Sequence, residues 1–232
     1  MDASAFTARR AGRRLRCLRL RLTAGAGPPL LVVSLVGWAL LLASGGLNAG
    51  GHLHHGMPGR GGPAPVAWLL MLVAMMPPLL SDAVHHLWTR SVERRRWRAI
   101  LLFAGGYVFV WMTAGWLLAA GVTRLAPVFA PGWRAAAATV LLAALWQTTP
   151  AKQRCLNRCH ARPPLGAPGT ASDLDAVRYG LATGGWCLGS CWALMLVPGT
   201  MGSAHAAAMM AAMVVMVVER HAPRRPQGVP SR

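Results

Sequence analysis

The sequence contains very few acidic residues. Only 6 Asp or Glu stand against 24 Lys or Arg in 232 residues, and the formal net charge is +18. It also lacks a visible internal repeat, which leaves one compact bundle as the simplest domain organisation.

The sequence lacks a nucleotide-binding loop too, so we expect any transport to be passive, exchange-driven or dependent on a periplasmic or membrane partner protein. In a soluble protein the basic excess would indicate nucleic-acid binding, so the placement of the basic residues decides its meaning.

Long apolar runs are abundant, because 54% of the residues are hydrophobic. Six runs have about the length needed to cross roughly 30 Å of hydrocarbon as helices. Lys and Arg between and around the runs number seven, one, five, two, five, none and four, and such alternation predicts a cytoplasmic location for both termini. The pattern excludes nucleic acid as the partner and makes the lipid bilayer the explanation. The runs cover 28–47, 64–81, 99–121, 132–150, 177–197 and 199–218.

These observations predict an all-α fold, a polytopic membrane helix bundle of about six transmembrane helices. We expect a basic cytoplasmic segment at 1–27, a six-helix transmembrane domain at 28–220 and a cytoplasmic tail at 221–232. The basic start is followed by an apolar run too long for a typical cleaved signal, so it is expected to remain as an anchor. The predicted location is the bacterial inner (cytoplasmic) membrane, crossed several times.

Sulfur recurs at helical spacing in residues 184–195, GGWCLGSCWALM. Cys187, Cys191 and Met195 are four residues apart, so they share one stripe of a helix. The next run begins after Pro198 and Gly199, and so short a connection predicts an antiparallel hairpin. In that hairpin we expect Cys191 at the depth of His205 and Cys187 at the depth of Met209. The second run is expected to place three further methionines at these two depths: Met71, Met75 and Met76.

Thiol, thioether and imidazole groups together are the ligand set that selects Cu(I), and they also suit Zn(II) where thiolates dominate. The cofactor predicted for this set is therefore copper (Cu+) or zinc. The alternative is packing, because Met and free Cys are ordinary core residues and the three glycines of the same run favour close helix contact. A polar side chain within a membrane helix needs a partner, which makes His205 harder to explain by packing.

Two further groups lie outside the runs. The loop 48–63 carries four residues that favour loose metal capture on the outer side: His52, His54, His55 and Met57. On the cytoplasmic side, Cys155 and Cys159 are again four apart within a basic segment, and cationic neighbours are expected to lower the pKa of both thiols. For each group the alternative is a set of solvated side chains that share no site.

Four ordered motifs resemble a bacterial family of integral membrane proteins described as predicted metal-binding. They are AWLLMLVAMMPPLL, GGYVFVW, WQTTPAKQRCLNRCHARP and GGWCLGSCWALMLV, followed by the pair Glu219–Arg220. The resemblance covers about residues 66–220 and implies metal ligands at eight positions. This sequence has Ser190 where that family tends to have a third cysteine, and His205 near a position where it tends to have a Trp-Met pair. The implied ligands are Met71, Met75, Met76, Cys155, Cys159, Cys187, Cys191 and Met195.

The sequence thus favours an inner-membrane protein, not an enzyme, that binds or translocates a soft metal ion. Two alternatives remain: a membrane thiol oxidoreductase with two cysteine pairs, and a noncatalytic membrane partner subunit. Against the oxidoreductase, the two cysteine pairs are expected to lie about nine residues of helix apart, too far for direct thiol exchange.

Overall fold

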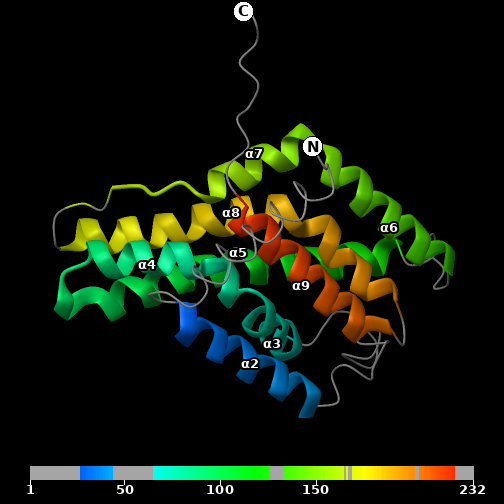
Figure 1. Ribbon diagram of the computed structural model, residues 1–232, viewed down its shortest axis with the longest axis horizontal. Helices are drawn as coiled ribbons and strands as arrows, with labels where there is room; N and C mark the ends of the chain where they lie inside the picture. The colour runs from blue at the N-terminus through cyan, green and yellow to red at the C-terminus, as the bar shows by residue number, and fades with distance from the viewer. Residues whose placement is uncertain are drawn as a thin grey trace, which may run out of the picture.

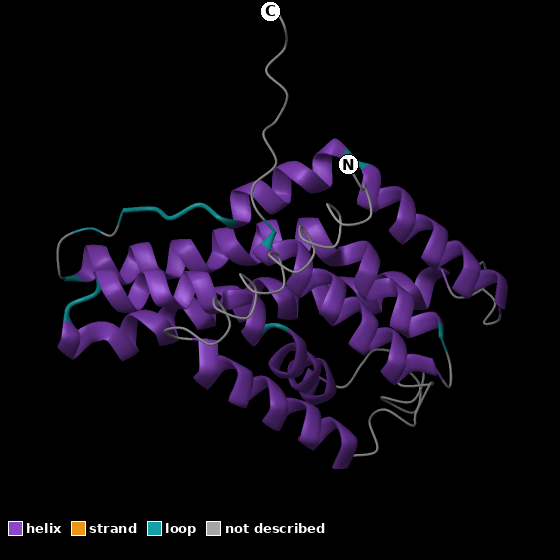
Figure 2. Cartoon of the chain, in the orientation of Figure 1, coloured by secondary structure: helices purple, strands orange, loops and turns teal. Residues whose placement is uncertain are grey.

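The computed structural model describes residues 27–43, 65–125, 133–164, 166, 169–201 and 204–222. Throughout these residues the regular structure is helical and contains no strand (Figure 2). The all-α prediction is therefore confirmed for the described part of the chain. The predicted amino-terminal segment, most of the carboxy-terminal tail and the loop 48–63 lie outside it.

Two long helices form the centre of the molecule, α5 (Arg96–Leu125) and α8 (Thr170–Thr200). They lie side by side along the longest axis, and α8 also contacts α6, α7 and α9 (Figure 1). Small residues bring their backbones together. A Cβ on Gly106 would lie 2.7 Å from a backbone oxygen of α8, and a Cβ on Gly180 would overlap the carbonyl oxygen of Phe103. Only glycine fits at such a crossing, so this sequence specifies how the two helices pack.

The second predicted run does not form one straight helix. It divides into α3 (Pro65–Met75) and a 3₁₀ turn (Pro77–Leu80), which leads directly into α4 (Ser81–Arg90). The axes before and after the break differ by 55°. Two consecutive prolines explain the break, because neither can donate a backbone hydrogen bond and each crowds the preceding turn. Helix α2 (Gly27–Ala43) packs against α3.

A sharp elbow joins α6 (Trp133–Thr148) to α7 (Pro150–Cys159). Proline at the first position of α7 is favourable, since that residue needs no hydrogen-bond donor. The hydroxyl of Thr149 accepts the backbone N–H of Lys152 at 3.2 Å and caps the new helix. The chain after the fourth predicted run is therefore helical as far as Cys159, and α7 folds back onto α8.

The connection from α8 to α9 lies later in the sequence than predicted. Helix α8 continues through Pro198 and Gly199 to Thr200, and α9 (His205–His221) begins after the short segment that follows. The predicted pairing of depths was therefore wrong in register. Arg220, near the end of α9, is the residue whose charge acts on Cys187. The prediction ended the helix at Pro198, because proline cannot donate a backbone hydrogen bond. Within α8, neighbouring groups compensate for the lost hydrogen bond and the helix continues.

The described residues do not confirm the predicted six membrane-crossing helices. Within the described residues, two helical segments are long and apolar enough to span, Glu93–Leu118 and Thr170–Thr200. A third is reached if the bent segments Pro65–Met75 and Pro77–Arg90 count as one span. Helices α2, α6 and α9 are apolar but shorter, with 17, 16 and 17 residues. At 1.5 Å per residue each measures about 24–26 Å, less than the roughly 30 Å of a hydrocarbon core.

Buried side chains form two separate cores. The aromatic core packs the start of α5 and α8 against α4, and it contains Ala83, Val84, Leu87, Ala99, Phe103, Ala176 and Tyr179. The sulfur core packs the later part of the same two helices against α2, α3, α7 and α9. Its buried members are Trp38, Leu41, Leu72, Ala74, Met75, Met76, Leu79, Tyr107, Trp111, Cys159, Cys187, Cys191, Met209, Ala212, Met216 and Val217.

Candidate metal centre

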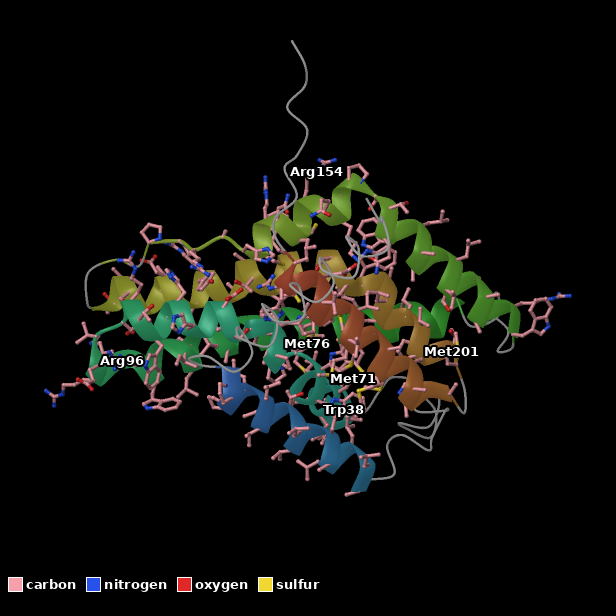
Figure 3. All side chains as sticks on the ribbon, in the orientation of Figure 1. Trp38, Met71, Met76, Arg96, Arg154 and Met201 are labelled. Atoms are coloured by element: carbon pink, nitrogen blue, oxygen red, sulfur yellow. The ribbon has the colours of Figure 1, made fainter. Side chains whose placement is uncertain are left out.

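The sulfur core gathers soft donor atoms from α3, α7, α8 and α9. Seven buried members carry sulfur, and four partly buried methionines pack around them: Met71, Met112, Met195 and Met213. In Figure 3, Met71 and Met76 lie with Trp38 where α2, α3 and α9 meet. The indole N–H of Trp38 points at the sulfur of Met213, 3.4 Å away. Residues far apart in the sequence are thus brought into one sulfur-rich interior.

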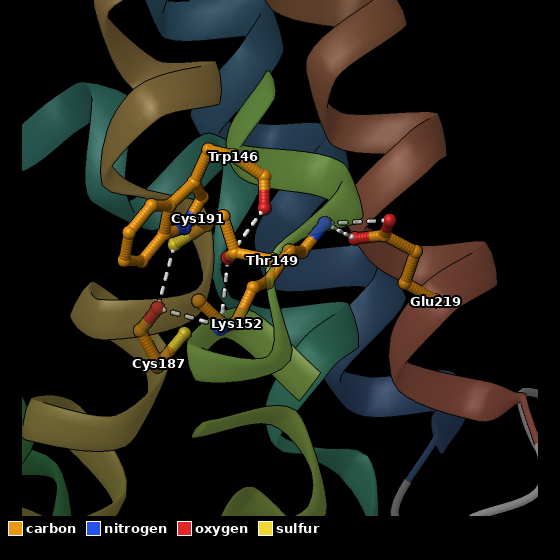
Figure 4. Close-up of polar contacts among 7 residues, drawn as sticks. Trp146, Thr149, Lys152, Cys187, Cys191 and Glu219 are labelled. Atoms are coloured by element: carbon orange, nitrogen blue, oxygen red, sulfur yellow. Dashed lines mark hydrogen bonds and ion pairs between the residues drawn. The ribbon is translucent and has the colours of Figure 1, made fainter. Parts of the chain in front are cut away.

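The two cysteines of α8 are held one turn apart on its buried face. The thiol of Cys191 donates to the backbone oxygen of Cys187 at 2.8 Å (Figure 4). The hydroxyl of Ser190 donates to the same oxygen at 2.8 Å, and the hydroxyl of Tyr107 donates to the sulfur of Cys187 at 3.2 Å. Both cysteine side chains are nearly inaccessible to solvent, so these contacts fix their orientation.

Helix α7 brings a second pair of cysteines against α8, and one of them reaches the sulfur core. The sulfur of Cys155 lies 2.9 Å from where a Cβ on Gly189 would stand, which is at the level of Cys187 and Cys191 but on the opposite side of α8. Cys159 is buried in the sulfur core and interacts electrostatically with Cys187. The predicted separation of the two pairs was wrong, because the elbow before Pro150 folds α7 onto α8. None of the four thiols forms a disulfide.

Two buried cations lie beside the thiols. The ammonium of Lys152 donates to both carboxylate oxygens of Glu219, at 2.6 and 2.7 Å, and so joins α7 to α9 (Figure 4). Arg220 is only 4% exposed, and its guanidinium contacts the thiol of Cys159. Its backbone oxygen accepts a bond from the imidazole of His160 at 2.6 Å. Charged groups in so apolar an interior are costly unless they serve the fold or a site.

A comparison with known protein families matches residues 65–230 to the family PpoB2, described as a copper chaperone. The match spans well over half of the 232 residues. The chain belongs to this copper chaperone family. No curated protein and no solved structure matches it. Membership supports the predicted link to a metal, and to copper in particular.

The predicted lowering of the pKa of Cys159 was wrong for this member of the copper chaperone family. Burial raises the pKa of its thiol to about 12, although the charge of Arg220 acts in the opposite direction. The basic residues that prompted the prediction point elsewhere: Arg158 stacks on the ring of Trp186, with 4.6 Å to the centroid. Cationic neighbours in the sequence therefore did not imply cationic neighbours of the sulfur.

The structure places His205 at the junction of α8 and α9, and its role as a ligand stays a prediction. It begins α9, and its Nδ1 lies 2.7 Å from the backbone oxygen of Pro198, where it ties the end of α8 to α9. Its neighbour Ala206 packs against the sulfur core. The outer-loop residues fall outside the described part of the chain: His52, His54, His55 and Met57.

The described residues contain no group of three His, Cys, Asp or Glu side chains arranged to hold a metal ion. The described interior therefore offers thiols together with thioethers, and not a conventional zinc-type cluster. Thioethers are soft, uncharged donors suited to Cu(I) and poor ligands for hard cations. Metal binding by the predicted cysteines and methionines stays a prediction, and the structure shows which of them share one interior.

Sequence reasoning missed four residues that border the thiols: Tyr107, Lys152, Glu219 and Arg220. Two of them stand in the motifs that resemble the metal-binding family and the other two form the pair that follows these motifs, and all four contributed only to the resemblance. The sequence did contain a signal for the three charged ones, since a charged residue at the boundary of an apolar run needs a partner. What the sequence alone did not reveal was that Lys152 and Glu219 are partners across 67 positions.

Proposed function

We propose that this protein is a membrane-embedded copper chaperone that binds Cu(I) within the sulfur core. One observation carries the proposal: thiols from α7 and α8 share a buried interior with thioethers from α3 and α9, in a chain of a copper chaperone family. Copper is the cargo here, so binding and release are the function and no catalytic step is proposed.

The donor set supports Cu(I) over zinc as the principal cargo. Cu(I) prefers thiolate and thioether ligands, and it accepts low coordination numbers that two or three sulfurs satisfy. The proposed ligands are the thiols of Cys159 and Cys187, completed by thioethers of the sulfur core such as Met75 and Met209, while Cys191 borders the site. Zinc prefers four ligands in a tetrahedral site, a geometry better served by the clusters missing from the described residues.

The outer surface supports a location in a membrane, for which the bacterial inner membrane remains our proposal. Large apolar side chains are exposed on helices that have no further protein neighbour, including Leu101, Phe109 and Trp116 on α5, and Leu141 and Leu145 on α6. Exposed apolar area on this scale is unfavourable in water and favourable in lipid. We retain cytoplasmic termini in this proposal because the basic residues alternate along the chain.

We propose Cys155 as the thiol through which copper leaves or enters the sulfur core. It is only half-buried, and it contacts α8 at the level of the two buried cysteines. A thiol at the edge of the interior can exchange a Cu–S bond with a neighbour in short steps. The outer loop with its His and Met residues is proposed as a point of collection, on the basis of its composition.

The test is metal stoichiometry in the purified protein. The wild type, loaded with Cu(I) under anaerobic reducing conditions and freed of excess metal, is expected to retain copper when measured by mass spectrometry. The double variant Cys187→Ser/Cys191→Ser is expected to lose most of it, while Met210→Leu, at a side chain that is 46% exposed, retains it. Equal copper in all three proteins would contradict the proposal.

The closeness of α7 and α8 thiols favours a second candidate, a thiol oxidoreductase. Cys159 is buried in the same sulfur core as Cys187 and Cys191, and the described cysteines are reduced, so disulfide exchange between α7 and α8 has a short path. Alkylation of free thiols in intact cells, followed by mass mapping, distinguishes the candidates. A disulfide between α7 and α8 that forms and is reduced in turn would favour the oxidoreductase, whereas four persistently reduced thiols favour the copper chaperone.

A further inference from the structure

Arg220 presents a charge that the rest of the described interior does not compensate. It stands in the last turn of α9 and is 4% exposed. Its Nε and Nη1 atoms are buried without a hydrogen-bond partner among the described residues. A guanidinium keeps its proton under all ordinary conditions, so the positive charge cannot be removed by burial. An orphaned buried cation is strongly unfavourable unless an anion is supplied.

The carboxylates nearby are already engaged. Glu219 is bound through both oxygens to Lys152, so this pair is neutral as a whole. Asp82 forms an ion pair with Arg162, 3.9 Å apart. No ion pair joins Arg220 to a carboxylate within the part of the chain that the structure describes.

The groups that do face the guanidinium are sulfur and phenol. Arg220 contacts the thiol of Cys159 and interacts electrostatically with Cys187 and with the hydroxyl of Tyr107. The hydroxyl of Tyr107 in turn donates to the sulfur of Cys187 at 3.2 Å, so these groups form one connected cluster. The two thiols become anionic when they bind a metal ion, since only thiolates are good ligands.

We propose that Arg220 is the built-in counter-charge of a bis-thiolate Cu(I) complex formed by Cys159 and Cys187. This inference rests on the proposed function. Two S–H bonds break, two Cu–S bonds form, and two protons leave to solvent, with no change of oxidation state. Two thiolates and one monovalent ion carry one negative charge, which the guanidinium neutralises.

The charge count also sets specificity. A divalent soft ion on the same two thiolates would be neutral, and Arg220 would remain an unpaired positive charge in a buried site. Because net charge in an apolar interior is costly, the site favours monovalent Cu(I) and disfavours Zn(II). The methionines add donors without adding charge, so they do not disturb this balance.

The first experiment measures Cu(I) and Zn(II) affinity by competition with calibrated chelators in the detergent-solubilised protein. Arg220→Gln is expected to weaken Cu(I) binding about 30-fold or more, the scale of removing one partner of a buried charge pair. Zn(II) binding is expected to stay equal or to strengthen, so the preference for copper falls. Arg220→Lys, which keeps the charge, is expected to restore most of the preference.

A matched control removes two buried charges of opposite sign and so leaves the net charge of the site unchanged. The double variant Lys152→Met/Glu219→Met deletes a neutral pair next to the same thiols, and it is expected to change Cu(I) affinity less than fivefold, well below the effect of the guanidinium. Helical circular dichroism and size-exclusion profiles establish that each variant is folded. A loss of copper preference in this control equal to that in Arg220→Gln would overturn the inference, because general disruption would then explain both.

A second measurement uses the wild type alone and so does not depend on a variant that folds. Ag(I), monovalent and soft, is expected to compete with Cu(I) for the site, whereas Cd(II), soft but divalent, competes poorly. If the wild type binds no copper, the proposed function fails. If it binds copper but takes Cd(II) as readily as Ag(I), or if Arg220→Gln keeps the preference, the charge inference alone fails.

Discussion

The aromatic core and the sulfur core are built on the same two helices, α5 and α8, yet they differ in chemistry. The aromatic core uses Phe103 and Tyr179, whose ring centroids are 5.1 Å apart, and aliphatic side chains around them. One helical turn after Phe103, the hydroxyl of Tyr107 donates to the sulfur of Cys187. From that level onward the neighbouring side chains are sulfur-containing residues and buried charged residues. The comparison separates what holds the helices together from what is available to bind an ion.

The sulfur core depends more heavily on charge pairing, and the largest expected effect tests this. Glu219→Gln removes the partner of Lys152, which is 4% exposed, and leaves an ammonium buried without compensation. We expect a loss of stability of about 3–5 kcal/mol. The measurement is chemical unfolding in detergent, and Lys152→Met/Glu219→Met serves as the control. A double variant as unstable as Glu219→Gln would show that packing, and not the unpaired charge, is responsible.

The aromatic core is expected to supply stability without contributing to copper binding. Leu87 is fully buried there, and Leu87→Ala leaves a cavity. We expect about 3 kcal/mol of destabilisation, within the range of such truncations. Copper per folded protein should stay at the wild-type value. A proportional loss of copper would mean that the two cores are not separable.

Adjacent methionines on α9 provide the sharpest contrast within the sulfur core. Met209 is 2% exposed and belongs to the core, whereas Met210 is 46% exposed on the outer face. Met209→Leu conserves volume, so its stability cost is expected below about 1.5 kcal/mol. Its Cu(I) affinity is expected to fall about tenfold, the equivalent of roughly 1.4 kcal/mol, and that of Met210→Leu to stay unchanged. Equal affinities in the two variants would exclude Met209 as a donor.

The smallest effect concerns reactivity and leaves stability untouched. With its pKa raised by burial to about 12, the thiol of Cys159 is almost entirely protonated at pH 8. Its alkylation by iodoacetamide, followed by mass spectrometry of the metal-free protein, is expected to be slow. The rate should rise about tenfold per pH unit up to that pKa, because the thiolate is the nucleophile. A rate that levels off near pH 9 would show that Cys159 is not buried as described.

The helices themselves were largely predictable, because apolar runs and their lengths report on helix content directly. The breaks were not predictable from the runs alone: two prolines bend the chain after Met76, whereas Pro198 lies inside α8. The difference depends on neighbours that supply hydrogen bonds, and local sequence does not contain them. The convergence of sulfur followed from helical spacing, although its register was wrong. The contact of α7 with α8 depends on the bend at Thr149. The sequence indicates that a helix can begin after Thr149, but not in which direction that helix runs.

The backbone oxygen of Cys187 has a consequence for how metal release would proceed. It accepts one bond from the thiol of Cys191 and another from the hydroxyl of Ser190, each at 2.8 Å. When an incoming ion binds Cys187 and the thiol of Cys191 turns toward the new thiolate, its bond to the oxygen is lost and the serine bond remains. The carbonyl oxygen therefore keeps a hydrogen-bond donor, and the helix turn does not need to rearrange each time metal binds or leaves. A cysteine at position 190 would add a third sulfur near the site but would remove the serine hydrogen bond to this oxygen. Ser190 thus gives up one possible ligand and keeps the helix turn intact when metal binds and leaves.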